Sequence, residues 1–451
     1  MTDSNNRNTG KWYEKFTAAG QRKKTVKSDK AGNRKRKTET RQQIQPHRER
    51  SGQPRETHPA AVVSHAPLFT AEPLSGAAGG ILLNFDNLVQ KVKPLNARQM
   101  AKLPQEIRTL SHELTDDRPD RRVGYMNETA RLSAYVRYFM WWNLVRLTRL
   151  LARPDMPVPA LTDGSACLDI GSGPLTVPTA LWLARPELRR KKLIWYCLDI
   201  SQSSLALGEE LYLAAAAATM AEEPDLSPWK IIRVKGEAGT GLRQKVSFVT
   251  CANMFNELLQ RSDMPPDYLA KKYAETLIAY TVKNDSSIFV VEPGVPRSAR
   301  LLSLLRDALM RRNFRILSPC PHAGTCPMDG KPGNKWCNFA FPAGDAPAKL
   351  LDLSAQAGIP KERAVLSFLL ATDSGSGEKK GNLLELRIVS DPIWLPGNRT
   401  GFYACSDLGL VLAVNAGGKP IASGDLLTVS RPEHPGNLGK DPKTGAVELE
   451  L

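Results

Sequence analysis

The feature that most constrains the fold is an alternation of apolar runs and amphipathic stretches between residues 166 and 312. The apolar runs, which predict strands, are 166–170, 193–199, 231–235, 246–252 and 287–292. The longer stretches, which predict helices, are about 175–186, 202–220, 267–282 and 297–312. Repeated strand–helix units place parallel strands in one sheet with helices on both faces. The sequence therefore predicts an α/β domain over residues 160–315.

The first predicted strand runs into a glycine-rich turn. Residues 168–174 read Leu-Asp-Ile-Gly-Ser-Gly-Pro, and in an open α/β sheet ligands bind beyond the carboxyl ends of the strands. Glycines there let the backbone turn tightly and approach a ligand closely. The pattern Asp-x-Gly-x-Gly resembles the first motif of class I S-adenosylmethionine-dependent methyltransferases, which have a Rossmann-like fold. It predicts Asp169, Gly171 and Gly173 as cofactor-binding residues, with an ordinary strand-to-helix turn as the alternative.

Two later strand ends extend the predicted cofactor site. Asp199 ends the second strand, where an acid can accept hydrogen bonds from both ribose hydroxyls; the alternative is an N-cap of the helix that begins at Gln202. Asn253 follows the strand at 246–252 and is expected to border the sulfonium, with helix capping as the alternative. The Asn-Pro-Pro-aromatic type of box found in enzymes that methylate exocyclic nitrogens is absent after this strand. We therefore assign no catalytic residue, and a bound cofactor is better supported than turnover.

The cysteines fall into two groups. Three lie in apolar runs and are expected to be buried small hydrophobic residues; these are Cys167, Cys197 and Cys251. The other four lie in a region rich in Gly and Pro or beyond it; these are Cys320, Cys326, Cys337 and Cys405. Four sulfur ligands suit an iron–sulfur cluster or Zn²⁺. A [4Fe–4S] cluster, Zn²⁺ and unliganded thiols remain open from the residues alone, as does His322 in place of Cys405.

The regions outside the α/β domain differ from it in composition. Residues 1–60 carry 16 Lys and Arg against 6 Asp and Glu, so a net charge of +10 out of +16 lies there. Such a tail is expected to be disordered over residues 1–80 and to attract phosphate, although a solubilising tail or a mitochondrial presequence is also possible. The remaining segments are expected to be a helical cap over 85–153, a cysteine cluster with a small β-rich element over 316–430, and a flexible tail over 431–451. No apolar run is long enough to span a membrane.

Several motifs together resemble one family, the methyltransferase-like assembly factors of the mitochondrial small ribosomal subunit and their bacterial relatives (Rsm-twenty-two, or methyltransferase-like protein seventeen). The motifs are Tyr135-Val136-Arg137-Tyr138, residues 168–176, residues 253–258, Val291-Glu292-Pro293-Gly294-Val295-Pro296, and Cys320-Pro321-His322 with Cys326-Pro327 and Trp336-Cys337-Asn338-Phe339. The resemblance covers about residues 95–430. It implies a [4Fe–4S] cluster held by Cys320, Cys326, Cys337 and Cys405, and binding to small-subunit rRNA during ribosome assembly or translation.

Two hypotheses for function follow from the sequence. The first is a ribosome-associated factor that uses a methyltransferase fold and a metal cluster as a scaffold, and the second is an active S-adenosylmethionine-dependent rRNA methyltransferase. A small-molecule methyltransferase is disfavoured by the basic tail. We expect a protein that is monomeric apart from the ribosome and has no membrane partner. The acids in the tail favour a bacterial cytoplasm over a mitochondrial matrix.

Overall fold

A computed structural model describes residues 59–115, 125–153, 156–157, 159–259, 263–332, 334–375, 381–415 and 420–451. Residues 1–58 of the predicted basic tail lie outside these ranges. Residues 59–80 were also predicted to be disordered, but they hold β1 (Val62–Ala66) and the start of α1 (Gly76–Leu83). β1 pairs with β14 (Leu426–Ser430). The composition of this segment did not indicate a strand, because its pairing partner lies more than 360 residues further along the chain.

The larger sheet has the strand order β4-β3-β2-β5-β6-β9-β7, with β8 paired to β9. Its strands are β2 (Ala166–Ile170), β3 (Ile194–Asp199), β4 (Lys230–Lys235), β5 (Phe248–Ala252), β6 (Ser287–Glu292), β7 (Arg315–Ser318), β8 (Phe339–Pro342) and β9 (Arg363–Thr372). Strands β2 to β6 are parallel, whereas β9 lies antiparallel between β6 and β7. The strand order reverses at β2, so the space beyond the ends of β2 and β5 is the expected ligand crevice.

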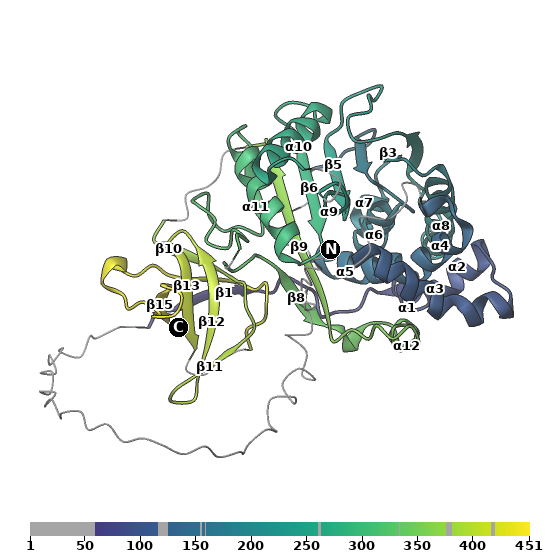
Figure 1. Ribbon diagram of the computed structural model, residues 1–451. Helices are drawn as coiled ribbons and strands as arrows, with labels where there is room; N and C mark the ends of the chain where they lie inside the picture. Colours follow the sequence, from purple (N-terminus) through teal and green to yellow (C-terminus); the bar gives the residue numbers. More distant parts are fainter. Residues whose placement is uncertain are drawn as a thin grey trace, which may run out of the picture. The chain divides into compact units, whose positions relative to one another are not determined.

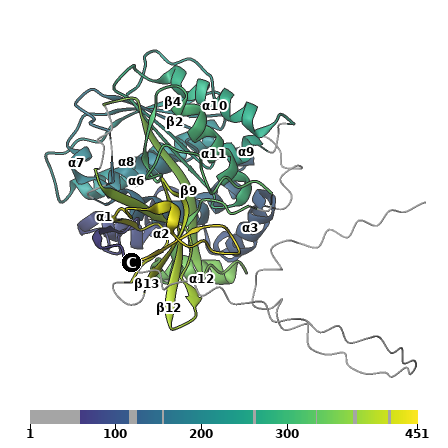
Figure 2. The same ribbon diagram turned by 90° about the vertical axis from the view of Figure 1, so that its left-hand side faces the viewer.

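Helices cover both faces of this sheet, as the sequence predicted. They are α6 (Thr176–Ala184), α7 (Pro186–Arg189) and α8 (Gln202–Met220) before β4, and α9 (Phe255–Leu258), α10 (Pro266–Tyr280) and α11 (Pro296–Met310) after β5. Side chains alternate along β2: Cys167 packs with α6 and α8, and Leu168 packs with α10 and α11. Figure 2 shows α6 and α8 on one side of the sheet and α10 and α11 on the other.

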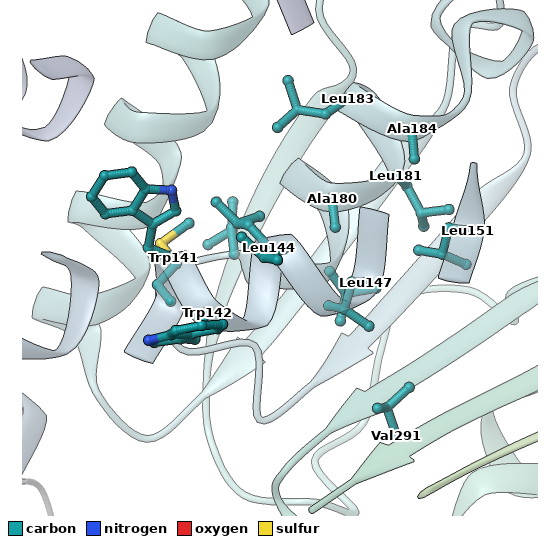
Figure 3. Close-up of a cluster of buried hydrophobic side chains, with 14 of the residues drawn as sticks. Trp141, Trp142, Leu144, Leu147, Leu151, Ala180, Leu181, Leu183, Ala184 and Val291 are labelled. Carbon is teal, nitrogen blue, oxygen red and sulfur yellow. The ribbon is translucent and has the colours of Figure 1, made fainter. Parts of the chain in front are cut away.

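A helical layer precedes the sheet in the chain and packs on α6 and α8 (Figure 1). Its elements are α1, α2 (Phe85–Val92), α3 (Ala97–Thr115), η4 (Tyr125–Asn127), α4 (Thr129–Ala134), the π-helical turn η5 (Tyr135–Met140) and α5 (Trp141–Leu151). The apolar face of α5 meets α6, where Leu144 and Leu147 lie beside Ala180 (Figure 3). Trp141 and Trp142 are each only 1% exposed, so packing accounts for these aromatic side chains.

The C-terminal region forms a second, smaller sheet with the order β1-β14-β10-β12-β13-β15, and β11 pairs with β12. Its remaining strands are β10 (Leu383–Ile388), β11 (Ile393–Leu395), β12 (Arg399–Ser406), β13 (Gly409–Asn415) and β15 (Val447–Glu450). The amide of Ala60, just before β1, donates to the carbonyl of Glu450 at 2.8 Å, which joins the two ends of the sheet. Buried apolar side chains such as Phe402, Val411 and Leu427 fill the interior.

Because its two ends are joined, this second sheet forms a barrel, and the order of its strands identifies the type of barrel. Strands β10, β12 and β13 form an antiparallel meander, β14 returns beside β10, and β15 lies parallel to β13. This is the Greek-key order of an OB-fold barrel, with β1 inserted between β14 and β15. The small β-rich element that the sequence predicted is therefore this barrel.

The predicted flexible tail at 431–451 differs from the structure. β15 lies within this segment, pairs with β13, and buries Leu449 to 4% exposure in the barrel interior. The strand has only four residues, too few for alternation to be recognised in the sequence. The other short elements are η7 (Ala343–Asp345), α12 (Ala348–Gln356) and η8 (Pro435–Asn437). Among the described residues, no helix combines the length and apolar character needed to cross a lipid bilayer.

Candidate cofactor cavity and cysteine centre

The glycine-rich turn after β2 has the backbone conformation that its glycines permit. Gly171 has φ +66° and Gly173 has φ +52°, both in the left-handed region that favours glycine. A Cβ on Gly171 would lie 2.9 Å from the side chain of Met254. The turn is therefore held close to the end of β5, and both glycines line a cavity beyond the strand ends.

Asp169 lies behind the turn and does not line the cavity. Its carboxylate is 1% exposed and accepts hydrogen bonds from Ser172 Oγ and from Thr250 Oγ1, each at 2.7 Å. It thereby ties the turn to β5. We predicted Asp169 as a cofactor-binding residue, but its side chain is not among those that line the cavity.

The burial of Asp169 predicts a pH dependence of stability. Burial raises the pKa of Asp169 to about 7, although hydrogen bonds from Thr250 and Ser172 lower it. Between about pH 4 and pH 7 the folded chain therefore keeps a proton that the unfolded chain releases, so stability falls as the pH rises, by up to about 1.4 kcal/mol per pH unit. The Asp169→Asn variant lacks this titration. We expect the wild-type chain to lose stability relative to the variant over that range, measured by denaturant midpoints; a pH-independent difference would contradict the assignment.

Asp199 does reach the cavity. Its Oδ2 accepts a hydrogen bond from the amide of Gly173 at 2.9 Å, and its Oδ1 accepts one from the amide of Ser201 at 2.8 Å. The N-cap of α8 is Ser201, whose Oγ accepts from the amide of Ser204. The alternative that Asp199 serves only as that cap is therefore wrong, and its carboxylate both fixes the turn and borders the crevice.

The cavity has a volume of about 400 Å³, within the range of small-molecule sites. The wall of the cavity contains Gly171, Gly173 and Asp199. The segment after β4, the helical cap and α10 contribute further residues. The lining residues that the sequence analysis did not identify include Gly236, Glu237 and Ala238 after β4, Met126 and Tyr135 from the cap, and Lys272, Tyr273 and Thr276 from α10. Nothing in the local sequence marks them, because they converge only through the fold.

Asn253 lies in the cavity wall at the end of β5 with φ +60°. Its backbone amide donates a hydrogen bond to the carbonyl of Val291 at 2.8 Å. It does not cap α9. That role belongs to the fully buried carboxylate of Glu292, which accepts from the amides of Phe255 and Asn256 at 2.9 and 3.0 Å. An acid at the end of β6 thus orients the segment that carries Asn253.

The other side of Asn253 is filled by the helical cap. A space of about 10 Å³ lies between α5 and the ends of β5 and β6, which is the size of one water molecule. Arg146 of α5 spans this region, donating to the carbonyl of Val365 at 3.1 Å and to Asn143 Oδ1 at 2.7 Å. Burial lowers the pKa of Arg146 to about 10. The space between α5 and the ends of β5 and β6 is therefore nearly filled, whereas Met254, Glu257 and Leu258 after β5 line the larger cavity.

The four predicted metal-ligating cysteines come from two parts of the chain. Cys320, Cys326 and Cys337 lie between β7 and β8, and Cys405 lies in β12. Burial raises the pKa of the Cys337 thiol well above its usual value, and the nearby thiols of the other three raise it further. His322 Nε2 lies 3.0 Å from Cys405 Sγ. Among the described residues, however, no group of three or more His, Cys, Asp or Glu side chains is arranged to hold a metal ion.

Parallel strands β2 to β6, the antiparallel β9 between β6 and β7, and a cavity at the carboxyl ends of β2 to β5 together define the class of the protein. It has the class I S-adenosylmethionine-dependent methyltransferase fold, as predicted. The family model described as mitochondrial small ribosomal subunit Rsm22 matches residues 129–395. The chain belongs to this family, which confirms the resemblance that the sequence motifs indicated.

Solved structures with a similar fold are distant in sequence. The ribosomal protein L11 methylase from Lactobacillus delbrueckii subsp. bulgaricus is 17% identical, covering 40% of this chain and 74% of its own, with a TM-score of 0.26. A SAM-dependent methyltransferase from Geobacter sulfurreducens in complex with S-adenosyl-L-homocysteine is 14% identical, covering 58% and 97%, with a TM-score of 0.27. At these values neither likeness bears on what this chain binds. A search of curated proteins found no match.

Proposed function

We propose that the chain is a factor of the small ribosomal subunit that binds rRNA, S-adenosylmethionine and a [4Fe–4S] cluster and acts in ribosome assembly or translation. We propose a binding function and not catalysis because the space on the α5 side of Asn253 is nearly filled. Asn253 borders both the cavity of about 400 Å³ and a space of only about 10 Å³ under α5. Methyl transfer requires the acceptor and the methyl group in line and nearly in contact, and the space under α5 leaves no room for an acceptor there.

The cavity fits S-adenosylmethionine in size and in chemistry. Gly171 and Gly173 have no Cβ atoms that would exclude a ligand. Each carboxylate oxygen of Asp199 accepts a hydrogen bond from one backbone amide and retains a further acceptor site. We assign Asp199 to the ribose hydroxyls and the turn to the amino-acid part of the cofactor. When bound, the cofactor would supply an activated methyl group; Asn253 and the cap would border its sulfonium side.

We assign a cluster to the cysteine centre on the resemblance of its cysteine motif to the family. One Zn²⁺ needs four ligand atoms within about 2.3 Å of one point, and the described side chains offer no such group. The thiolates of a [4Fe–4S] cluster bind four separate iron atoms and so lie further apart. Two buried nitrogen atoms near the thiols, His322 Nδ1 and Arg306 Nε, have no hydrogen-bond partner. Arg306 Nε is a donor, whereas the role of His322 Nδ1 depends on the tautomer of the ring, and a buried polar atom without a partner supports a polar group nearby.

The OB-fold barrel supports the assignment of RNA as a partner. The loop between the first two strands of such a barrel contributes to oligonucleotide binding, and here that loop contains β11 with Trp394. Ile393 and Leu395 pack on the barrel, while Trp394 points away and is 79% exposed. Residues 381–451 contain 6 Lys and Arg against 8 Asp and Glu. The barrel would therefore contribute base stacking, and the basic residues at 1–60 would contribute the attraction to phosphate.

Replacing Trp394 by alanine is expected to weaken binding of single-stranded RNA by about 1–3 kcal/mol, the range for one base stacked on one aromatic ring. Fluorescence anisotropy with a labelled single-stranded oligonucleotide measures this. Tyr268→Ala on α10 is the matched control, since Tyr268 is an exposed aromatic residue at 50% exposure on the other domain. Equal affinities of the wild-type and Trp394→Ala chains would remove the barrel from the RNA site.

The second candidate is an active rRNA methyltransferase, which the size of the cofactor cavity favours. The test compares small-subunit rRNA methylation in cells with and without the protein, next to its co-sedimentation with the subunit. Unchanged methylation with clear co-sedimentation supports the scaffold function, whereas a methylation site lost with the protein would establish the enzyme. Iron and acid-labile sulfide analysis of anaerobically purified chain tests the cluster; a colourless, zinc-loaded protein would overturn that assignment.

The compartment, the monomeric state and the domain boundaries remain predictions. The family name is mitochondrial, which favours the matrix alternative, and the expectation of a bacterial cytoplasm stands beside it untested. We retain the cap at 85–153 and the α/β domain at 160–315 as the proposed boundaries. Fractionation of cells that express the tagged chain would distinguish the two compartments.

A further inference from the structure

Two cations converge where the helical cap meets the segment that leads into β9. Arg146 of α5 donates from Nε to the carbonyl of Trp142 at 3.3 Å, and the ammonium group of Lys361 lies 5.8 Å from the centre of the Trp142 ring. Trp142 is buried, and its Nε1 donates to Ser354 Oγ of α12 at 3.2 Å, which holds α12 against α5. The guanidinium and the ammonium are therefore brought to one residue from two distant parts of the chain.

Neither cation forms an ion pair with an Asp or Glu among the residues that the structure describes. Other cations of α5, α12 and β9 do have such partners: Arg149 pairs with Asp345, Lys349 with Asp86, and Arg363 with Asp391. Arg146 instead donates to neutral acceptors, which are the carbonyls of Trp142 and Val365 and the side-chain oxygen of Asn143. The positive charges of Arg146 and Lys361 are thus left uncompensated on a surface where the neighbouring charges are balanced.

Two like charges placed together disfavour each other. Burial, and then the positive charge of Arg146, lower the pKa of Lys361 to about 8, so both groups are mainly charged at neutral pH. The nearest acids do not relieve this repulsion. Glu292 lines the small space under α5 with Arg146, but its carboxylate accepts the first amides of α9. Glu362 is exposed and, in the described part of the chain, pairs with neither cation. An anion from outside the chain would relieve it.

The pair is accessible and lies beside the candidate cofactor site. Lys361 is exposed and Arg146 is half-buried. Arg146 lines the small space under α5 with Asn253, and Asn253 also lines the cavity of about 400 Å³. Two half-buried aromatic rings precede α5, Tyr135 and Phe139, which stack with their centres 5.7 Å apart. Cations next to aromatic rings are typical of surfaces that follow a nucleic-acid backbone.

We propose that Arg146 and Lys361 form a binding site for a backbone phosphate of rRNA. The site rests on the proposed binding of rRNA, and it adds a contact on the α/β domain and its cap to those proposed for the barrel and the basic residues at 1–60. Arginine and lysine contacts to phosphate oxygens position a nucleic acid but do not read its sequence. The site therefore contributes affinity and salt dependence, without a sequence preference.

The experiment measures binding of a labelled oligouridine to the full-length chain by fluorescence anisotropy over a series of salt concentrations. The variants are Lys361→Gln, Lys361→Glu and Arg146→Gln, and the unfolding midpoint of each is measured in urea. Lys191→Gln is the matched control, because it removes the same charge from an exposed lysine. Lys191 precedes β3 and so lies at the edge of the sheet opposite the cavity. In the described part of the chain it has no ion pair either.

We expect Lys361→Gln to reduce the slope of log affinity against log salt concentration by about 0.7, the value for one phosphate contact with a single strand. At about 0.1 M salt the same term corresponds to roughly fivefold weaker binding. Lys361→Glu should bind more weakly still, yet unfold at a higher urea concentration than the wild-type chain, because the new carboxylate can pair with Arg146. Lys191→Gln should retain the wild-type affinity and slope.

Wild-type affinity and slope in both Lys361→Gln and Arg146→Gln would overturn the phosphate site and leave RNA as a partner. An equal loss in Lys361→Gln and Lys191→Gln would also overturn the site, since the effect would then be one of net charge. A wild-type chain that binds no RNA would overturn the proposed function itself. If Arg146→Gln does not fold, the opposite changes expected for Lys361→Glu, weaker binding with higher stability, decide the matter.

Discussion

Replacing Gly208 by alanine is expected to destabilise the chain and to abolish most of its affinity for S-adenosylmethionine. Gly208 lies inside α8, and a Cβ there would sit 2.4 Å from the carbonyl carbon and 2.6 Å from the Cα of Pro174. These are backbone atoms that cannot rotate away, so α8 and the glycine-rich turn must separate. Overpacking of this kind costs about 1–3 kcal/mol. The same movement breaks the bond from the Gly173 amide to Asp199, and a loss of about 1.4 kcal/mol in binding is already tenfold.

Gly80→Ala in α1 is the control for this substitution. Nothing lies within 4 Å of a Cβ at Gly80, so the change adds only helix propensity, worth roughly 0.5–1 kcal/mol in favour of alanine. Urea midpoints and isothermal titration with S-adenosylmethionine give the two readouts. If Gly208→Ala were as stable as Gly80→Ala and bound the cofactor normally, close packing of α8 on the turn would not be what shapes the cavity.

The elements that the sequence predicted well are those whose signals are local. The helix expected at 202–220 is α8 with the same bounds, and the strand expected at 287–292 is β6. Each has either a long periodic pattern or a continuous apolar run, as expected for a strand buried on both faces. The three cysteines expected in strands, Cys167, Cys197 and Cys251, are buried as predicted.

The elements that the sequence did not predict depend on distant partners. β9 has a long apolar run, yet its position between β6 and β7 is set by pairing with both. Arg137 and Arg146 of the cap are turned inward, where they donate hydrogen bonds to Gln90 Oε1 and Val365 O, respectively. A hydropathy pattern treats every arginine as exposed, so it cannot anticipate a buried one that finds its acceptors through the fold.

The candidate cofactor site also contains residues that the sequence predicted and residues that it did not. Gly171, Gly173, Asp199 and Asn253 were predicted from their places at strand ends, and all four line the cavity. Asp169 belongs to the same motif but faces inward, because neighbouring residues of a strand point to opposite sides. Glu292 was named only within a family motif, although its carboxylate accepts hydrogen bonds from the first amides of α9. The filled space under α5 could not be predicted, since it depends on where the cap packs.

The Cys405→Ala substitution is expected to remove most of the bound metal and to weaken the connection between the barrel and the α/β domain. The other three cysteines lie within 18 residues of one another, from 320 to 337, so Cys405 is the ligand that joins two distant parts of the chain. In a structural metal site the binding free energy contributes directly to folding and is on the order of 10 kcal/mol. We expect iron per chain to fall at least tenfold and the unfolding midpoint to fall with it. Cys251→Ala, a buried cysteine in β5, controls for the loss of packing alone.

His322 provides the competing explanation, and its own variant separates the two. His322 Nε2 lies 3.0 Å from Cys405 Sγ, so either atom is placed to serve as the fourth ligand. Burial, and then the nearby Arg306, lower the pKa of His322, which keeps the ring neutral and able to bind a metal at physiological pH. If Cys405 is the ligand, His322→Ala retains the metal and Cys405→Ala loses it. Metal retained in Cys405→Ala and lost in His322→Ala would assign the fourth ligand position to the imidazole. The barrel would then be held to the α/β domain by packing and by the hydrogen bond from Arg387 Nε to the carbonyl of Pro319.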